Sequence, residues 1–421
     1  MIKGEKIRFD IYNILYSIYK FNKNLSSQDI QKKISKHKKE DISFLNNVTL
    51  NSMRFNLHSS IIIKKYIKKK IRDKEKVLLI SAITQIVFLD FKEYAVINCT
   101  VEIAKKLKMF HGLINAVLKN ISKDKESLKN INITFNDLPV WFKDKSNSLT
   151  IAKKKLFLKN FNKEPSLHIV FKNEEKIKNF EENIVKTSNI SGFVSKKQNI
   201  TKMSSFTKGD WWVQDFSSFF PLNNLTIENK HKSFLDACAA PGGKAFQILS
   251  TNTKILLNDK NLFRIKTLKK NLKRLRFNSK IVNEDFTKFP KSEKFDFIVL
   301  DTPCTAVGTI RKNPEIFFKS EAPDFDYLSN IQEKMLDKAS LLLNNNGLIL
   351  YMVCSFLEYE TKGQIDKFLN KNSNFKLDNF KLIKNSKYSG LVKNNLMITL
   401  PDKILEKNID GYFAAYLKKI R

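Results

Sequence analysis

The chain has 421 residues, which is too long for one ordinary core and predicts two or three domains. Its hydrophobic content of 42% is enough to pack such domains. Its formal charge of +34 favours a polyanionic partner such as nucleic acid, although an A/T-rich genome would also enrich lysine. The four cysteines form no CxxC pair and no metal-ligand spacing, which argues against a disulfide framework and a zinc site and favours a reducing cytoplasm.

The N-terminal part is expected to be helical. Its first ten residues, MIKGEKIRFD, lack the apolar core of a signal peptide. The longest apolar run, residues 77–89, is shorter than the roughly 20 residues of a membrane span and contains Ser, Thr and Gln, so it predicts a buried helix. Apolar residues recur at helical spacing from Ile7 to Ile18 and from Ile114 to Ile121. These patterns predict an all-α domain over residues 1–125 and no membrane association.

A polar stretch then ends the helical periodicity and indicates a linker. Residues 139–230 contain a strand-like LHIVF, a polar helix expected near 174–186 and a second extended piece near 190–200, which together predict a small α+β module. Trp211 and Trp212 could stack on bases, but an aromatic pair just before a strand is more often part of a core.

From residue 231 to residue 421, short apolar strands alternate with amphipathic helices. The strands are expected at SFLDA, KILLND, SKIVNED, FDFIVLD and GLILYMVCS, and a long helix is expected near 324–343. This alternation predicts a mostly parallel sheet covered by helices on both faces, a Rossmann-like α/β domain.

The first of these strands runs into the loop DACAAPGGK at residues 236–244. Gly242 and Gly243 allow a tight turn and a close approach of the backbone to a ligand. The loop is not the GxGxxG of dinucleotide-binding proteins, and it is not a P-loop because Ala245 stands where a magnesium-binding Ser or Thr would be. An NAD or ATP site is therefore disfavoured.

Two aspartates end the next two strands. Asp259 follows the loop by about 20 residues, the position from which a carboxylate can accept the ribose hydroxyls of an adenosine-containing cofactor. Asp285 could face the adenine. The structural alternative is that both aspartates cap the helices that follow them.

Two thiols follow two further strands. VLDTPC at 299–304 and YMVCS at 351–355 place Cys304 and Cys354 at strand ends, where an α/β sheet binds its ligands. We expect both thiols to face one crevice, although each could be a small buried hydrophobe.

The motifs DACAAPGGK, LDTPC and YMVCS, in this order, resemble those of the RsmB/NOP family of RNA 5-methylcytosine methyltransferases, which use S-adenosyl-L-methionine. KGDWWVQDFSS at 208–218 and DGYFAAYLKK at 410–419 extend the likeness. The stretch before residue 121 resembles the NusB-like RNA-binding domain fused to the branch that acts on bacterial 16S ribosomal RNA. Asp301, Thr302, Pro303, Cys304 and Thr305 replace the usual DAPCS.

The resemblance implies roles for particular residues. Attack on the cytosine falls to Cys354 and product release to Cys304, while Asp301 and Lys244 assist at the base. The implied cofactor-binding residues are Cys238, Ala239, Ala240, Pro241, Gly242, Gly243, Lys244, Asp259, Asp285 and Asp301.

A thiolate is needed because the 5-carbon of cytosine is a poor nucleophile until a neighbouring addition activates it. We expect a monomeric cytoplasmic enzyme without metal that acts on 16S rRNA. The alternatives are a methyltransferase of transfer RNA or 23S rRNA, and a non-catalytic RNA-binding or antitermination factor.

Overall fold

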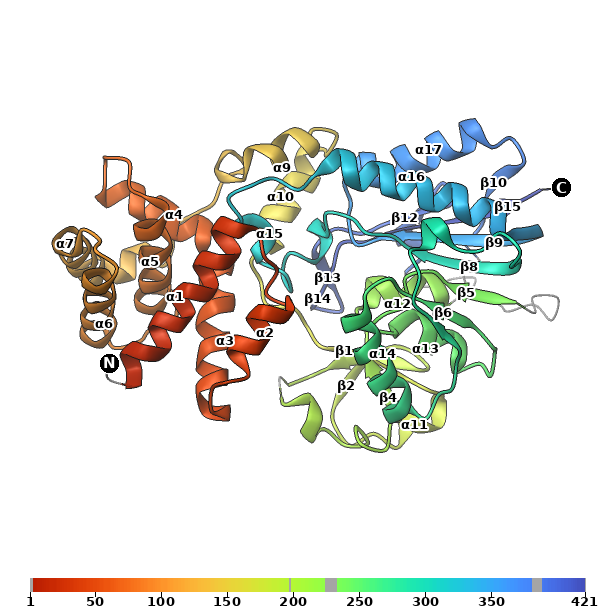
Figure 1. Ribbon diagram of the computed structural model, residues 1–421, viewed down its shortest axis with the longest axis horizontal. Helices are drawn as coiled ribbons and strands as arrows, with labels where there is room; N and C mark the ends of the chain where they lie inside the picture. The colour runs from red at the N-terminus through yellow and green to blue at the C-terminus, as the bar shows by residue number, and fades with distance from the viewer. Residues whose placement is uncertain (1–2, 197, 224–232, 381–387, 421) are drawn as a thin grey trace. The chain divides into compact units, whose positions relative to one another are not determined.

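The computed structural model describes residues 3–196, 198–223, 233–380 and 388–420 (Figure 1). The chain divides into two compact units. Unit 1 comprises Met1–Asn162 and Ile310–Pro323, and unit 2 comprises Lys163–Thr309 and Asp324–Arg421. The helical unit thus continues past the predicted boundary at residue 125, and the predicted boundary at residue 230 lies outside the described residues.

Unit 1 is helical, as the spacing of its apolar residues predicts. Ile11, Leu15 and Ile18 of the first helix are fully buried, and the apolar run at 77–89 forms α5 and a π-helical turn, η1, inside the same core. The elements are α1 (Lys3–Phe21), α2 (Gln28–Ile34), α3 (Lys39–Arg54), α4 (Asn56–Tyr66), α5 (Asp73–Ile83), η1 (Thr84–Phe88), α6 (Glu93–Lys106), α7 (His111–Lys123), α8 (Lys125–Leu128), η2 (Phe135–Asp137), α9 (Val140–Lys145) and α10 (Ile151–Asn160).

A second stretch of chain completes unit 1. Residues 310–323 leave unit 2 after β8, form α15 (Glu315–Phe318) and return to unit 2 at α16. Phe318 is buried in the core of unit 1, with its ring 5.6 Å from that of Tyr19, and Phe317 lies 5.0 Å from the ring of Phe142. Two phenylalanines from the second half of the sequence therefore complete a core built mainly by the first 162 residues.

Unit 2 begins with a small antiparallel sheet in the order β2-β3-β1-β4. The predicted helix near 174–186 is shorter in the structure, because residues from Ile184 onward pair with β3 as a strand. Trp211 and Trp212 are buried, so the core role is confirmed and base stacking is wrong for this pair. The elements are β1 (His168–Phe171), α11 (Glu174–Lys178), β2 (Ile184–Ser188), β3 (Ser191–Val194), η3 (Ile200–Lys202) and β4 (Trp211–Val213).

The large sheet of unit 2 has the order β11-β12-β15-β9-β8-β5-β6-β7, with β10 also pairing with β15. β5 to β9 pair with one another in parallel, as predicted, and the pairs made by β15 are antiparallel. The strands are β5 (Phe234–Asp236), β6 (Leu256–Asn258), β7 (Ile281–Val282), β8 (Phe295–Asp301), β9 (Leu343–Val353), β10 (Phe375–Asp378), β11 (Val392–Lys393), β12 (Leu396–Ile398) and β15 (Phe413–Lys419). A separate hairpin pairs β13 (Asp402–Ile404) with β14 (Lys407–Ile409).

Helices cover both faces of this sheet, as Figure 1 shows. Along β8, Phe297 and Val299 pack into one core, whereas Ile298 and Leu300 pack into the other, as the twofold alternation of a strand requires. The first face is covered by α12 (Phe216–Asn223), α13 (Gly243–Leu249) and α14 (Leu262–Leu275), and the second by α16 (Phe325–Leu342) and α17 (Lys362–Lys371). Short 3₁₀ turns complete the unit: η4 (Phe286–Lys288), η5 (Val307–Thr309), η6 (Glu358–Glu360) and η7 (Ser389–Leu391).

Within the described ranges, no helix combines the length and the apolar character that crossing a bilayer requires.

Candidate active site

The carboxyl ends of five parallel strands share one edge of the large sheet. From β5 the chain proceeds to β6 and β7 on one side, whereas β8 and β9 lie on the other side, so the strand order reverses between β5 and β8. A reversal of this kind opens a crevice in which α/β proteins bind their ligands. The loops after β5 and β8, which carry most of the predicted site residues, therefore begin on neighbouring strands.

The loop after β5 turns tightly into α13. Gly242 has a φ of +121°, and a Cβ atom at this position would lie 2.0 Å from Cζ of Phe246. Because a side chain would be both strained and obstructed, glycine is required here. Ala239 and Ala240 are buried beneath the turn and Pro241 is exposed. Part of the loop is thus fixed by packing, and its tip faces solvent.

Asp259, directly after β6, is buried and holds this loop. Its Oδ2 accepts a hydrogen bond from the backbone N–H of Ala240 at 3.2 Å, and its Oδ1 accepts one from the N–H of Asn261 at 2.8 Å. The cap of α14 is instead the side chain of Asn261, which accepts from the next helical N–H groups. The capping alternative therefore does not account for Asp259, which ties the second strand to the glycine loop.

Asp285 is the N-cap of η4. Its Oδ1 accepts hydrogen bonds from the backbone N–H of Thr287 at 3.0 Å and from the hydroxyl of Thr287 at 2.7 Å. These bonds hold the pKa of Asp285 below its usual value. The capping alternative accounts for this carboxylate, and its proximity to an adenine stays a prediction.

The two thiols lie side by side. β8 and β9 are parallel neighbours with Asp301 opposite Met352, so the residues just beyond them reach the same place. The Sγ atoms of Cys304 and Cys354 are 3.2 Å apart, and both residues are only partly exposed. The structure thus brings together the cysteines that the sequence places 50 residues apart.

One of these thiols is held protonated. The hydrogen bond to Cys354 and burial raise the pKa of Cys304 well above its usual value, and the carboxylates of Glu360 and Asp301 add to the effect. Cys304 therefore keeps its proton at neutral pH, and its sulfur lies within hydrogen-bonding distance of the sulfur of Cys354.

Lys244 and Asp301 form an ion pair beside the thiols. The Nζ atom lies 2.5 Å from Oδ2 of Asp301 and 5.7 Å from the ring centre of Tyr412. Burial pulls the pKa of Lys244 down, but the carboxylate of Asp301 outweighs it, so the pKa is raised overall. Lys244 remains a cation whose charge is directed at the strand end that carries Cys304.

Asp236, the last residue of β5, was missed by the sequence analysis as a site residue. It is 1% exposed, and burial together with the nearby carboxylates of Asp301 and Asp259 raises its pKa to about 7, although Lys244 opposes the change. A carboxyl group of this kind, among other charges, is typical of a functional site. The available signal was its position as the first letter of DACAAPGGK.

Glu360, just beyond the second thiol motif, tethers the first. Its Oε1 accepts from the backbone N–H of Thr305 at 2.7 Å and its Oε2 accepts from the Thr305 hydroxyl at 2.6 Å. It is fully buried, which raises its pKa even though the hydrogen bonds oppose this. Gln332 completes the support by donating to the carbonyl of Pro303 at 2.9 Å. The residues on either side of Cys304 are thereby fixed to α16 and η6.

A pair of glycines closes the other side of the cysteine loop. The N–H of Gly308 donates to the carbonyl of Cys354 at 3.0 Å, and the N–H of Gly411 donates to the carbonyl of Gly308 at 2.8 Å. A Cβ on Gly308 would lie 1.9 Å from the carbonyl oxygen of Gly411. This close backbone approach links both thiol loops to the segment before β15.

The described residues contain no group of three or more His, Cys, Asp or Glu side chains placed to hold a metal ion. The side chains gathered at these strand ends include two thiols, one ammonium group and several carboxyl groups. Such a set can form and release a thioether bond and can move protons. Cys238 lies half-buried in the same loop, where burial raises the pKa of its thiol, which favours the neutral form.

The chain is similar to known proteins along most of its length. Residues 223–418 match the family described as 16S rRNA methyltransferase RsmB/F, and residues 6–123 match the NusB family. The ribosomal RNA small subunit methyltransferase B of Pasteurella multocida is 25% identical over 412 residues, which cover 91% of this chain and 89% of that protein.

Solved structures share the fold. The crystal structure of PH0851 has a TM-score of 0.71 and 21% identity, covering 100% of this chain and 99% of that one. NSun6 from Pyrococcus horikoshii, solved with SFG, has a TM-score of 0.55 and 18% identity, covering 66% of this chain and 97% of that one.

Proposed function

Because the chain joins a methyltransferase domain of the RsmB/F family to a domain of the NusB family, we propose that it methylates the 5-carbon of a cytosine in 16S ribosomal RNA. The methyl donor is S-adenosylmethionine. The observation that carries the proposal is the 3.2 Å approach of the Cys304 and Cys354 sulfurs at the carboxyl ends of β8 and β9. A methyltransferase that acts on a more reactive atom has no need of a thiol nucleophile.

The residues at the strand ends fit this cofactor. Three buried or half-buried carboxyl groups, those of Asp236, Asp259 and Asp301, lie at the strand ends; Lys244 pairs with Asp301, and Arg264 lies 3.7 Å from Asp259. Asp259 lies where a carboxylate accepts ribose hydroxyls. The cofactor supplies an electrophilic methyl group.

Cys354 is the proposed nucleophile. Its sulfur lies 3.2 Å from that of Cys304, at the carboxyl ends of two neighbouring parallel strands. Addition of its thiolate to the 6-carbon of cytosine makes the 5-carbon enamine-like and able to accept the methyl group. The second thiol is then close enough to act on the same base.

Cys304 is the proposed residue for release. After methylation the 5-carbon must lose a proton before the thiolate of Cys354 can be eliminated. Cys304 is near enough to act in that proton transfer, directly or through water, and Glu360 holds its loop in place. Because its pKa is raised, Cys304 is protonated in the free protein and must lose that proton before it can accept one from the 5-carbon.

Asp301 and Lys244 are the proposed groups that hold the base. Asp301 can accept from the exocyclic amine of cytosine, and the ammonium group of Lys244 can donate to the base carbonyl. Their 2.5 Å ion pair fixes both side chains before the substrate arrives. The target base must be single-stranded or flipped out of a helix, because a stacked and paired cytosine does not expose its 6-carbon.

The experiment that tests this function is bisulfite sequencing of total RNA from cells that lack the protein. We expect one 5-methylcytosine to disappear from 16S rRNA and to return with the wild-type gene but not with Cys354→Ala. Loss of a methylated position in 23S or transfer RNA would move the substrate elsewhere. No lost position, with RNA binding intact, would support a non-catalytic factor.

A further inference from the structure

The two thiols of the candidate active site are also placed to react with each other. The Sγ atoms of Cys304 and Cys354 are 3.2 Å apart. The sulfurs of a disulfide are about 2.05 Å apart, so a shift of about 1 Å brings this pair to bonding distance.

Backbone hydrogen bonds hold the two cysteine loops together. The N–H of Thr302 donates to the carbonyl of Met352 at 3.1 Å, and the N–H of Gly308 donates to the carbonyl of Cys354 at 3.0 Å. These bonds lie on either side of Cys304 in the sequence. The fold therefore sets the proximity of the sulfurs, and two groups held in contact react far faster than the same groups free in solution.

A small molecule has access to both thiols. Cys304 and Cys354 are each partly exposed at the carboxyl ends of β8 and β9. A thiol that an oxidant reaches alone proceeds from sulfenic acid to sulfinic acid, which dithiols do not reduce. A thiol with a second thiol beside it is instead captured as a disulfide, which dithiols do reduce.

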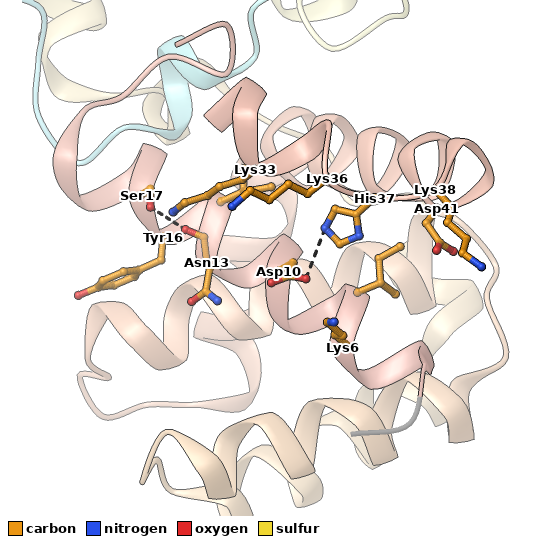
Figure 2. Close-up of a pocket in the computed structure, with 12 residues that line it drawn as sticks. Lys6, Asp10, Asn13, Tyr16, Ser17, Lys33, Lys36, His37, Lys38 and Asp41 are labelled. Carbon is orange, nitrogen blue, oxygen red and sulfur yellow. Dashed lines mark hydrogen bonds and ion pairs between the residues drawn. The ribbon is translucent and has the colours of Figure 1, made fainter. Parts of the chain in front are cut away.

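The other two cysteines lack a neighbouring thiol. In the part of the chain that the structure describes, neither Cys99 nor Cys238 makes a contact between sulfur atoms. Cys99 is the one cysteine in the sequence of unit 1. The polar hollow of this unit has a volume of about 740 Å³, and the described residues that line it include Asp10, 3.4 Å from Nε2 of His37, but no cysteine (Figure 2). The pair in unit 2 is therefore the one that the structure prepares for a disulfide.

We propose that a hydroperoxide converts Cys304 and Cys354 into a reversible disulfide within the chain, and that this modification switches methyl transfer off. The disulfide follows from the geometry, whereas its consequence for methyl transfer rests on the proposed function. Both sulfurs that the methylation uses are withdrawn together. In a reducing compartment, a disulfide of this kind is transient and regulatory rather than structural.

The reaction balances with hydrogen peroxide as the oxidant. The thiolate of one cysteine attacks a peroxide oxygen, so that an S–O bond forms, the O–O bond breaks and the sulfur is oxidised to a sulfenic acid. The hydroxide that leaves takes up the proton of that thiol and becomes water. The second thiolate then attacks the sulfenic sulfur, so that an S–S bond forms and the S–O bond breaks. The hydroxide released in this step takes up the proton of the second thiol and becomes a second water molecule.

The test maps the disulfides of the full chain. The reduced protein is freed of reductant, exposed to hydrogen peroxide, denatured with iodoacetamide to block the remaining thiols, and digested with trypsin without reduction. Each of the four cysteines lies on its own tryptic peptide, so mass spectrometry identifies every linkage. Methyl transfer from S-adenosylmethionine to unmethylated 16S rRNA is measured before oxidation, after oxidation and after treatment with dithiothreitol.

Three variants accompany the wild type. Cys99→Ser is the matched control, because it removes one thiol and leaves the pair intact. Cys304→Ser and Cys354→Ser each remove one half of the pair. Dimedone, which traps sulfenic acids, is added to a parallel sample of each protein.

We expect the peptides of Cys304 and Cys354 to be linked in wild type and in Cys99→Ser. The linkage should form roughly tenfold faster than the thiols of Cys99 and Cys238 are lost, because only the pair is held in contact. Methyl transfer by the wild type should fall by about tenfold or more on oxidation and return with dithiothreitol. In Cys304→Ser and Cys354→Ser the remaining sulfur should be labelled by dimedone or oxidised to a form that dithiothreitol does not restore.

Any of three results would overturn the inference: oxidation without a link between Cys304 and Cys354, a link that joins Cys238, Cys99 or a second chain instead, or methyl transfer that is unchanged once the link has formed. Failure of the proposed function gives a different result. A reduced protein that methylates no RNA would refute that function and the switch with it, while the mapped disulfide stands. A reduced protein that methylates RNA but forms no link would reject this inference alone.

Discussion

Asp236→Asn is expected to make unit 2 more stable at high pH while impairing the site. Burial raises the pKa of Asp236 to about 7 from the value of 3.8 that the group has outside the fold. Between these pH values the folded protein holds a proton that the unfolded chain has lost, so stability falls as the pH rises toward 7 and is constant above it. Asparagine has the shape of the protonated acid and does not ionise, so the variant escapes this loss.

The magnitude follows from the same numbers. Each unit of pKa difference is worth about 1.4 kcal/mol, so the full difference corresponds to about 4 kcal/mol above pH 7. About 2 kcal/mol of this accumulates between pH 5 and pH 7. The stability of Asp236→Asn relative to wild type should therefore rise by about 3 kcal/mol between pH 5 and pH 8.

The assay is urea unfolding followed by tryptophan fluorescence. In a Trp141→Phe background the remaining tryptophans, Trp211 and Trp212, both lie in unit 2 and report its unfolding. Asp366→Asn is the matched control, because it makes the same substitution in unit 2 at a side chain that is 55% exposed. A constant stability difference between Asp236→Asn and wild type across this range would refute the assigned pKa of Asp236.

Three further outcomes are expected. Glu360→Gln keeps the shape but weakens both hydrogen bonds to Thr305, so turnover should fall at least tenfold in a methyl-transfer assay, and unchanged turnover would remove Glu360 from the support of the Cys304 loop. Gly242→Ala places a methyl group against Phe246 and should cost several kcal/mol in thermal unfolding or abolish cofactor binding; a fully active, equally stable variant would contradict the required turn. Asp259→Ala should weaken S-adenosylmethionine binding at least tenfold by calorimetry, because it removes both a proposed ribose acceptor and the bond to Ala240, and equal affinity would exclude it from the site.

The convergence of the thiols could be predicted from the sequence because a residue directly after a strand lies at the carboxyl edge of the sheet. Two apolar strands that are parallel neighbours deliver whatever follows them to the same edge, and Cys304 and Cys354 each follow such a strand within three residues. The glycine turn at 242 could be predicted for a similar reason, since glycine is the residue that adopts its φ without strain.

Other features depend on contacts between residues far apart in the sequence, which the local sequence pattern does not predict. The sequence does not predict that Phe317 and Phe318 pack in unit 1, because an apolar pair fits any core. The helix expected up to residue 186 is a strand from Ile184, since pairing with β3 overrides a weak local preference. Asp236 was overlooked because a carboxyl group at a strand end acquires its altered pKa only from the charges that the fold collects around it.

The central claim concerns which cysteine attacks. Wild type, Cys304→Ala, Cys354→Ala and the double variant are incubated with substrate RNA and S-adenosylmethionine, and covalent complexes are resolved on a denaturing gel. We predict a stable RNA adduct in Cys304→Ala, in which Cys354 attacks but release fails, and no adduct in Cys354→Ala or in the double variant. An adduct that persists in Cys354→Ala and is lost in Cys304→Ala would contradict the assignment and exchange the two roles.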